Sequence, residues 1–428
     1  MLHEGQQVEL AVEKAASGGW MLARHLGQVV LVRGAIPGER VAAWIERAEK
    51  RLAYAVTRDV IEPSPDRVPV PADPMCGGLL LAHVAYPRQL ALKSDIVRDA
   101  FARLGHIPID QAIDVAGSRT DGYRMRVRLH VRGGRVGFYR EGTHHLCDAA
   151  ATGQLSTGTI STAQRIAIEL DRVAAGALTS ISITESVAGD QRAAHLELAA
   201  GAQVPASTLE TVMDSAGLTG ISAREADAFR NVLVGTPAVR DPLSTIIGND
   251  DIEGSLQRHA ESFFQGNRYL LSTLVAAVLD AVPRDHAVLD LYAGVGLFSV
   301  SLAAAGHDAG ITAVEGDRAA GEDLIQNAKP YARLHPVVAH VEDAVAGRQR
   351  SPSPTTIADP PRTGLSKQAS DGLARYGSSR IVYVSCDPPT LARDARRLLD
   401  AGYRLTSIRA FDLFPNTPHV ETLAIFDR

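Results

Sequence analysis

The sequence predicts an α/β fold, in which a small β-barrel and a central α+β domain precede a doubly wound, Rossmann-like sheet. Three observations carry this prediction. Short strand-like runs separated by glycine turns fill the N-terminal segment, an arginine-rich hairpin follows, and from about residue 261 strands and helices alternate. We therefore expect three domains, at residues 1–62, 75–250 and 251–428.

Composition narrows the class of protein. Of the 428 residues, 45% are hydrophobic and 22% are charged, which is ordinary for a globular chain. No apolar run reaches about 18 residues and the N-terminus lacks a secretory signal, so we expect a cytoplasmic monomer with no membrane association. Cys76, Cys147 and Cys386 lie far apart, which predicts reduced thiols. With a net charge of −5, any nucleic acid must be bound by local basic patches.

Residues 1–62 have the pattern of a small barrel. Turn signals, Ser-Gly-Gly at 17–19 and Pro-Gly at 37–38, separate the strand-like runs. The segment is comparatively basic, and barrels of this size often hold oligonucleotides. A structural barrel with a solvated surface accounts for the segment equally well. Five prolines at 63–74 then predict a linker. The three runs expected as strands are 8–12, 27–33 and 39–45.

A basic hairpin follows a predicted helix at 86–104. Basic and apolar side chains alternate along residues 123–132, and Gly133 and Gly134 provide the turn. Alternation with period 2 places the basic groups on one face, where they repel one another unless an anion lies over them. A nucleic-acid backbone fits that demand better than intramolecular pairing with acidic residues. The candidate RNA-binding residues are Arg124, Arg126, Arg128 and Arg132.

The C-terminal half predicts a nucleoside site at the carboxyl edge of its sheet. Predicted strands at 287–292 and 311–315 flank a Gly-x-Gly turn whose glycines let a ligand approach the backbone. Glu315, at the end of the second strand, can accept both ribose hydroxyls. Ser299 stands where the dinucleotide fingerprint has its third glycine, which disfavours a pyrophosphate cradle. S-adenosylmethionine, a nucleoside without phosphates, fits better.

Two further strands are expected to end at the same edge, together with a third at 337–341. The strand at 355–358 leads into Asp359-Pro-Pro-Arg, and the strand at 381–385 leads into Cys386. Asp-Pro-Pro-Thr after the cysteine begins a helix, whose N-terminus favours a thiolate. An inert buried thiol is the commoner fate of a lone cysteine. The position at a ligand-binding edge favours a nucleophile instead.

A nucleophilic thiol narrows the chemistry. It has no use in methylating an amine, but it is needed where the target carbon is not nucleophilic, as at C5 of uracil. Thiolate attack on C6 makes an enolate whose C5 can take a methyl group. A base must then remove the C5 proton, and Glu421 is the candidate, with His419 nearby.

These motifs are similar to those of the RNA (uracil-5-)-methyltransferase family. Pro-Gly-Glu-Arg at 37–40 also looks like the family's TRAM barrel. The resemblance implies S-adenosylmethionine as cofactor, Cys386 as nucleophile and Glu421 as base. The matching stretches are 263–267, 290–296, 359–365, 384–388 and 414–422. The implied cofactor contacts are Gln265, Tyr292, Gly294, Glu315 and Asp359, to which we add Asp343 for the adenine side.

Two departures from the family pattern lead to further expectations. Members with a TRAM barrel often hold a four-iron cluster on four cysteines, but Val70 and Leu79 stand at two of those positions. The fourth position falls on Cys147 or, in another register, on Thr152. Two thiols cannot hold such a cluster, so we expect no iron–sulfur cluster and no metal. Asp387 stands where the family usually has asparagine, and its carboxylate is expected to oppose thiolate formation.

Residues and resemblance together imply methylation of C5 of a specific uridine in structured RNA. The favoured substrate is 23S ribosomal RNA, and a uridine of the tRNA T-loop is the alternative. A further alternative is an RNA-binding folding factor with weak methylation activity. The presence of both Cys386 and Glu421 argues against it, since binding alone needs neither. A small-molecule methyltransferase would not need the basic hairpin. The target nucleotide and the role of residues 150–250 do not follow from the sequence.

Overall fold

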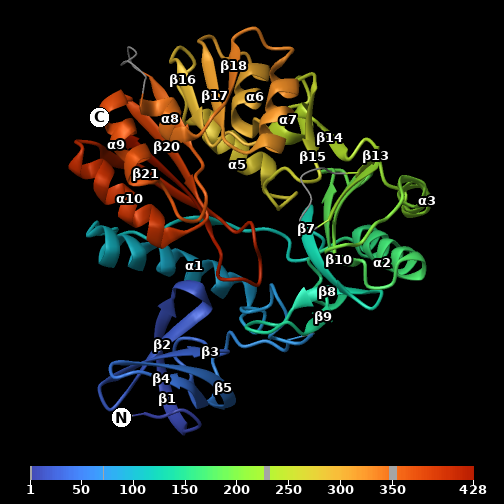
Figure 1. Cartoon of the computed structure of the whole chain (residues 1–428). Coiled ribbons are helices and arrows are strands. Elements are labelled where there is room, and N and C mark those ends of the chain that lie inside the picture. The colour runs from blue at the N-terminus through green and yellow to red at the C-terminus, as the bar shows by residue number, and fades with distance from the viewer. Residues whose placement is uncertain (1, 71, 226–231, 347–353) are drawn as a thin grey trace.

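The computed structural model describes residues 2–70, 72–225, 232–346 and 354–428, and its C-terminal half contributes seven strands to an eight-stranded sheet. Five parallel strands run in the order β18-β17-β16-β19-β20, and the antiparallel β22 and β21 extend the sheet beyond β20 (Figure 1). The predicted doubly wound fold is thereby confirmed. The strands are β16 (Val288–Leu291), β17 (Ile311–Glu315), β18 (Leu334–Val338), β19 (Thr355–Ala358), β20 (Arg380–Ser385), β21 (Arg404–Phe411) and β22 (Glu421–Asp427).

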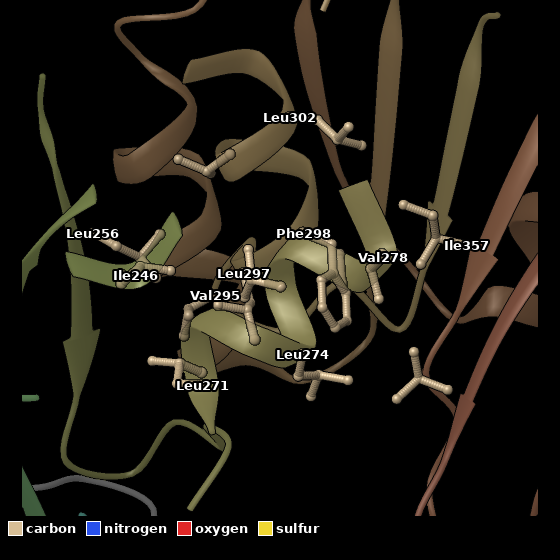
Figure 2. Close-up of a cluster of buried hydrophobic side chains, with 14 of the residues drawn as sticks. Ile246, Leu256, Leu271, Leu274, Val278, Val295, Leu297, Phe298, Leu302 and Ile357 are labelled. Carbon is tan, nitrogen blue, oxygen red and sulfur yellow. The ribbon is translucent and has the colours of Figure 1, made fainter. Parts of the chain in front are cut away.

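Helices cover both faces of this sheet, because its strands send apolar side chains alternately into two cores. One core contains Leu274 and Val278 of α5 together with Phe298 of α6, as Figure 2 shows. The opposite core contains Leu289 of β16 and Tyr383 of β20, packed with α8, α9 and α10. Burial of each large apolar side chain contributes about 1.5–3 kcal/mol. The helices are α5 (Leu271–Asp280), α6 (Leu297–Ala304), α7 (Arg318–Ala328), α8 (Val341–Ala346), α9 (Lys367–Tyr376) and α10 (Pro388–Asp400).

The strand expected at 337–341 begins and ends three residues earlier, as β18. The difference arises because Pro336 interrupts the apolar run. Proline cannot donate to a strand ladder and is confined mainly to edge strands. The structure is consistent with this, because β18 lies at the end of the sheet order.

The N-terminal segment closes into a five-stranded barrel in the order β1-β2-β3-β5-β4, with β4 pairing back to β1. The barrel was predicted, but two of its strands were not. One of them, β5, turns Ala53 and Ala55 inward, and alanine is a weak strand signal. Buried Glu39 ties the following segment to the barrel by accepting hydrogen bonds from the Arg67 guanidinium at 2.6 and 2.7 Å. The strands are β1 (Gln7–Ala16), β2 (Trp20–His25), β3 (Gln28–Arg33), β4 (Arg40–Ala48) and β5 (Leu52–Glu62).

The basic hairpin belongs to a seven-stranded sheet with the order β13-β12-β11-β10-β7-β8-β9. Its predicted alternation is present: Met125, Val127 and Leu129 are buried, whereas Arg128 and Arg132 are exposed. Helices α2 and α3 lie on the outer side of this sheet (Figure 1). The elements are β7 (Arg126–Arg132), β8 (Arg135–Tyr139), β9 (Leu146–Asp148), α2 (Thr157–Val173), β10 (Leu178–Glu185), β11 (Arg192–Leu198), α3 (Ala206–Ala216), β12 (Gly220–Glu225) and β13 (Val232–Gly235).

Two elements that precede the hairpin in the chain pack against the C-terminal sheet. Strand β6 (Val115–Ala116) pairs with β21, and α1 (Tyr86–Ala100) lies between the barrel and α10 (Figure 1). A turn at Phe101–Gly105 follows α1 and contacts α10 so closely that a Cβ at Gly105 would lie 2.9 Å from the carbonyl oxygen of Ala392. The proposed boundaries at 62 and 250 remain predictions. Pro71 of the predicted linker and residues 226–231 and 347–353 lie outside the described residues.

A short connection leads from the central sheet to the C-terminal half. It consists of a two-stranded sheet, β14 (Ala238–Pro242) with β15 (Ser255–His259), and the short helix α4 (Leu243–Ile247) between them. In the part of the chain that the structure describes, no helix is both long and apolar enough to cross a membrane.

The expectation of three reduced cysteines was wrong, because Cys76 and Cys147 form a disulfide. They are 71 residues apart in sequence, but a bridge between Cys76 and Arg140 and the pairing of β8 with β9 bring their Cα atoms to 5.8 Å. Thr152 instead donates its hydroxyl to the carbonyl of Ala149 at 2.7 Å. Because the two thiols are bonded to each other, these residues do not fit an iron–sulfur cluster.

Candidate active site

Predicted site residues meet at the carboxyl edge of the C-terminal sheet. Cys386 directly follows β20, and Asp359 directly follows the neighbouring β19. Glu421 is the first residue of β22, which runs antiparallel to β20 with Thr422 opposite Ser385. The start of β22 therefore lies beside the end of β20. This topology brings the candidate base next to the candidate nucleophile, although 34 other residues separate them in the chain.

The Gly-x-Gly turn after β16 forms an open cradle. Gly294 has a φ of 59°, and a Cβ built there would meet nothing within 4 Å. Its N–H donates to Glu315 Oε2 at 2.7 Å, and the N–H of Asp317 donates to Oε1 at 2.6 Å. Gly296 is required for packing, since a Cβ there would come within 2.7 Å of Val300. The backbone thus fixes the orientation of the predicted ribose acceptor.

Buried carboxyl groups gather below this cradle. The Gln265 side-chain amide donates to Asp359 Oδ2 at 3.2 Å. Burial raises the pKa of Asp359 to about 7; the Gln265 hydrogen bond lowers it and the Glu315 charge raises it. Burial likewise raises the pKa of Asp290 to about 7, with further contributions from Asp359 and Glu315. A cationic ligand would relieve the repulsion among these carboxylates, and the sulfonium of S-adenosylmethionine is such a cation.

Metal binding does not explain the acidic groups. No three of the described His, Cys, Asp and Glu side chains are arranged to hold a metal ion. A nucleoside with a positive centre therefore suits the combination of glycine cradle, ribose acceptor and buried acids better than a metal does.

The structure places two neighbouring acids of α8 differently. Asp343, predicted for the adenine side, is exposed in the first turn of the helix. Glu342 is partly buried, accepts a hydrogen bond from the Ser366 hydroxyl at 2.7 Å and raises the pKa of the Tyr292 phenol, although burial is the larger cause. Tyr292 itself has a φ of 61°, which non-glycine residues rarely adopt. Glu342 is thus the acid of this pair that acts on Tyr292.

The Cys386 thiol is protonated at neutral pH. Burial raises its pKa to about 11, and the Glu421 and Asp359 carboxylates add to the shift. Arg362, beside the sulfur, lowers the pKa in part. The helix N-terminus was expected to favour a thiolate, and desolvation opposes that effect. Asp387 accepts a hydrogen bond from the N–H of Thr390 at 2.9 Å and caps α10, so its carboxylate is engaged by the helix.

Glu421 has the environment of a strong base. Its side chain is 2% exposed, and its Oε1 has no hydrogen-bond partner among the described residues. Burial and the Asp359 charge raise its pKa well above the ordinary value, against the opposing effect of Arg362. His419, the other proton acceptor considered, is different. Burial and the Arg362 charge lower its pKa to about 4, so it is neutral and weakly basic.

The hairpin arginines divide into an inner and an outer pair. Arg124 donates to Gln154 Oε1 at 2.9 Å, and its charge lowers the pKa of His419, which places it at the active site. Arg126 donates to the carbonyl oxygen of Ser262 at 3.1 Å. Arg128 and Arg132 face solvent. Across the described ranges, no ion pair joins any of these four arginines to a carboxylate, as expected for a surface that meets an anion.

Sequence reasoning missed the role of two cations at this site. Arg362 enters the sequence pattern only as part of Asp-Pro-Pro-Arg, yet it acts on Cys386, Glu421 and His419. Its position as the last residue of Asp-Pro-Pro-Arg was a usable signal. Lys93 lies on α1 and also acts on His419, but no motif marks it.

Comparison with known proteins identifies the relatives of this chain. Residues 349–428 match the family model described as tRNA (Uracil-5-)-methyltransferase, and residues 2–56 match the TRAM domain. The chain is 31% identical to an RNA methyltransferase of Bifidobacterium longum, over 99% of this chain and 97% of that one. It is 30% identical to the 23S rRNA (uracil(1939)-C(5))-methyltransferase RlmD of Alkalilimnicola ehrlichii, over 98% and 96% of the two chains.

A solved structure shares the whole fold. The tRNA (uracil-54, C5)-methyltransferase of Pyrococcus abyssi, in complex with S-adenosyl-L-homocysteine, matches with a TM-score of 0.75. The match covers 98% of this chain and 100% of that one, at 24% identity. At that level of identity the likeness concerns the fold.

Proposed function

The chain belongs to the RNA (uracil-5-)-methyltransferase family, and from this premise we propose that it methylates C5 of a specific uridine in structured RNA, with 23S ribosomal RNA as the favoured substrate. The observation that carries the proposal is the adjacency of Cys386, directly after β20, and Glu421, the first residue of β22. An RNA-binding protein without this activity would need neither group. We further propose that the enzyme acts as a monomer in the cytoplasm.

The proposed reaction begins at C6 of the uracil. Cys386 loses its proton to solvent and its sulfur adds to C6, while the C5–C6 electron pair moves to O4 as an enolate. S-adenosylmethionine, when bound, supplies the methyl group that C5 takes. Glu421 then removes the C5 proton, and the electron pair of that C–H bond re-forms the C5–C6 double bond and expels the sulfur. Arg362 would stabilise negative charge on the sulfur and on the enolate.

The cofactor would be held at the open cradle. Gly294 lets it approach the backbone, Glu315 would accept its ribose hydroxyls, and Tyr292 with Gln265 would border it. The buried Asp359 would face its positive charge. Asp343 would lie at the adenine side only if its exposed carboxylate turns inward, whereas Glu342 is already directed to Tyr292.

RNA would reach the site along the basic face of the hairpin. Arg124, next to His419, would meet the target nucleotide, and Arg126 would lie close behind it. The exposed Arg128 and Arg132 would contact phosphates further out. Since the uracil must enter a buried site, the target uridine has to leave its stack, which favours a loop or a weakly paired position.

The two substrate candidates differ in what supports them. RlmD, which covers nearly the whole chain at 30% identity, is named for 23S ribosomal RNA. The Pyrococcus enzyme, named for tRNA uracil 54, shares the fold at lower identity. The barrel does not separate the two candidates, because the Pyrococcus match covers 98% of this chain. The greater identity to RlmD is what favours ribosomal RNA. The tRNA T-loop uridine therefore stands as the second candidate.

The test is methyl transfer to two defined RNAs. Purified protein would be incubated with methyl-labelled S-adenosylmethionine and either a 23S fragment or a tRNA transcript, and 5-methyluridine would be mapped. We expect label at one uridine of the ribosomal fragment. Label only in the T-loop would select the second candidate, and no 5-methyluridine in either RNA or in total cellular RNA would contradict the proposal.

The outer arginines give a matched binding test. Arg128→Gln with Arg132→Gln should weaken RNA binding and lower its log–log salt slope by about one unit for each phosphate that the variant no longer binds. Arg103→Gln is a control, because Arg103 lies on the turn after α1, far from the hairpin in sequence and paired with Asp99. Unchanged affinity and slope in the double variant would exclude a phosphate-binding role.

A further inference from the structure

The loop between β21 and β22, residues 412–420, is anchored by segments outside the C-terminal domain. Its two ends carry Asp412 and, directly after the loop, Glu421. We propose that the buried ion pair of Lys93 on α1 with Asp412 positions this loop, and through it Glu421, for removal of the C5 proton. The inference rests on the proposed function, because it assigns Lys93 and Asp412 a role in a step that Glu421 performs.

The ion pair is completely enclosed. Both side chains are 0% exposed, and the Lys93 ammonium donates to Asp412 Oδ1. The same ammonium donates to the carbonyl oxygen of Phe414 at 3.1 Å, so one cation holds two points of the loop. Burial lowers the pKa of Lys93, and the Asp412 charge opposes that shift. The Asp412 carboxylate thus favours the protonated ammonium, which burial alone disfavours.

A second set of contacts holds the middle of the loop. The Gln89 side chain, one turn before Lys93 on α1, donates to Asn416 Oδ1 and accepts from the Asn416 N–H, both at 2.9 Å. The carbonyl oxygen of Asn416 accepts from the N–H of Leu81 at 2.8 Å. Asn416 has a φ of 63°, a left-handed conformation that asparagine tolerates. Hydrogen bonds from α1 and from the segment before it therefore hold the loop in one conformation.

A residue of the C-terminal half and the barrel touch the same loop. Asn267 donates its amide to the carbonyl oxygen of Leu413 at 3.1 Å. In the barrel, a Cβ built at Gly19 would lie 3.3 Å from Pro418, so the turn between β1 and β2 approaches the loop directly. Movement of the barrel or of α1 would therefore shift the loop that leads into Glu421.

The strand register links the ion pair to the base. Phe411, the last residue of β21, is paired with Glu421 across the ladder, and Asp412 is the next residue. A shift of Asp412 would displace the strand end opposite Glu421. Misplacement of a catalytic group by about 1 Å can cost about 100-fold in rate. Lys93 and Asp412 do not contact the base themselves, so they are positioning residues.

Stability alone does not account for such a pair. Desolvation of two charges offsets much of their attraction, and replacing both by apolar residues of similar volume is often neutral. Removing only one partner leaves a buried unpaired charge and is strongly destabilising. If the pair is only structural, replacing both residues should restore stability and activity together. If the pair positions Glu421, replacing both should restore stability but not activity.

The experiment compares Lys93→Met with the double variant Lys93→Met, Asp412→Leu. The single variant should have a lowered Tm. The double variant should regain most of the Tm and bind S-adenosylmethionine as the wild type does, yet turn over about 10- to 100-fold more slowly. Because proton removal is the impaired step, a larger fraction of its active enzyme should be trapped as covalent RNA adduct during turnover.

A second variant, which removes only one side-chain contact, keeps the test informative if the double variant does not fold. Asn416→Gly keeps the left-handed backbone but removes the side-chain contact with Gln89, so a smaller rise in adduct is expected. A double variant, or Asn416→Gly, with wild-type turnover and wild-type adduct fraction would overturn the positioning role while leaving the proposed function intact. Wild-type enzyme that makes no 5-methyluridine would overturn the proposed function, and the positioning role with it.

Discussion

The three cysteines occupy two contrasting environments. Cys386 lies at the sheet edge among Glu421, Asp359 and Arg362, with no disulfide partner. Cys76 and Cys147 lie in the central domain, bonded to each other beside apolar side chains such as Leu79. The same residue type thus serves as a candidate nucleophile in one place and as a covalent staple in the other.

The difference lies in the neighbours of each sulfur. The charged groups around Cys386 shift the pKa of its thiol, so its reactivity depends on them. At the central site, Leu79 and Val70 stand where the resemblance to the family implies further cysteines. The two sulfurs that remain are bonded to each other. The proposed chemistry belongs to the Cys386 site, and the other two cysteines form a structural link.

The largest expected effect comes from replacing the lone thiol. Cys386→Ser should lower methylation by about 10⁴-fold or more, because the enolate cannot form without attack on C6. Binding of S-adenosylmethionine should be unchanged. The matched control is the double variant Cys76→Ser, Cys147→Ser, assayed well below its Tm, which should keep most of its activity. Equal losses in the two variants would remove the contrast between the sites.

The Cys76–Cys147 disulfide should contribute to the free energy of unfolding and not to activity. The double variant should lose about 4 kcal/mol of unfolding free energy, since a loop closed over 71 residues restricts the unfolded chain. Denaturant titration with and without reductant measures this. Cys386→Ser should titrate as the wild type does in both conditions. If reductant leaves the wild-type midpoint unchanged, the disulfide does not contribute.

A smaller effect should appear in the pH dependence of alkylation. Because the pKa of Cys386 is raised to about 11, its thiolate fraction should grow about tenfold per pH unit between pH 7 and 9. Arg362→Gln removes the cation that lowers this pKa and should slow alkylation by iodoacetamide at every pH in that range. The disulfide-bonded pair should remain unlabelled throughout. A plateau above pH 8 would show that the thiol is more acidic than its surroundings indicate.

Much of the edge site could be predicted from the sequence, because its signals are local. A strand, a glycine turn and a helix appear together in sequence, and so do Cys386 and the helix that follows it. The period-2 pattern of the hairpin is equally local, and its buried and exposed sides alternate as expected. The strand predicted at 337–341 was misplaced because Pro336 interrupts the apolar run near the start of β18.

The remaining features depend on contacts between distant segments. Lys93 and Asp412 are separated by 319 residues, and neither belongs to a motif. Cys76 and Cys147 come together through the Cys76–Arg140 bridge and the pairing of β8 with β9. The protonated state of Cys386 follows from burial, which a sequence pattern does not reveal. In each case tertiary packing outweighed the local signal.

The central claim is that Cys386 bonds to C6 and Glu421 releases the product, and trapping tests it most directly. Glu421→Gln keeps the shape of the side chain but cannot accept the C5 proton, so methylated adduct should accumulate. Wild-type, Glu421→Gln and Cys386→Ala, Glu421→Gln proteins would be incubated with substrate RNA and S-adenosylmethionine and run on a denaturing gel. The account predicts a slow protein–RNA band in the single variant that is missing from the double variant. Wild-type turnover by Glu421→Gln with no such band would contradict it.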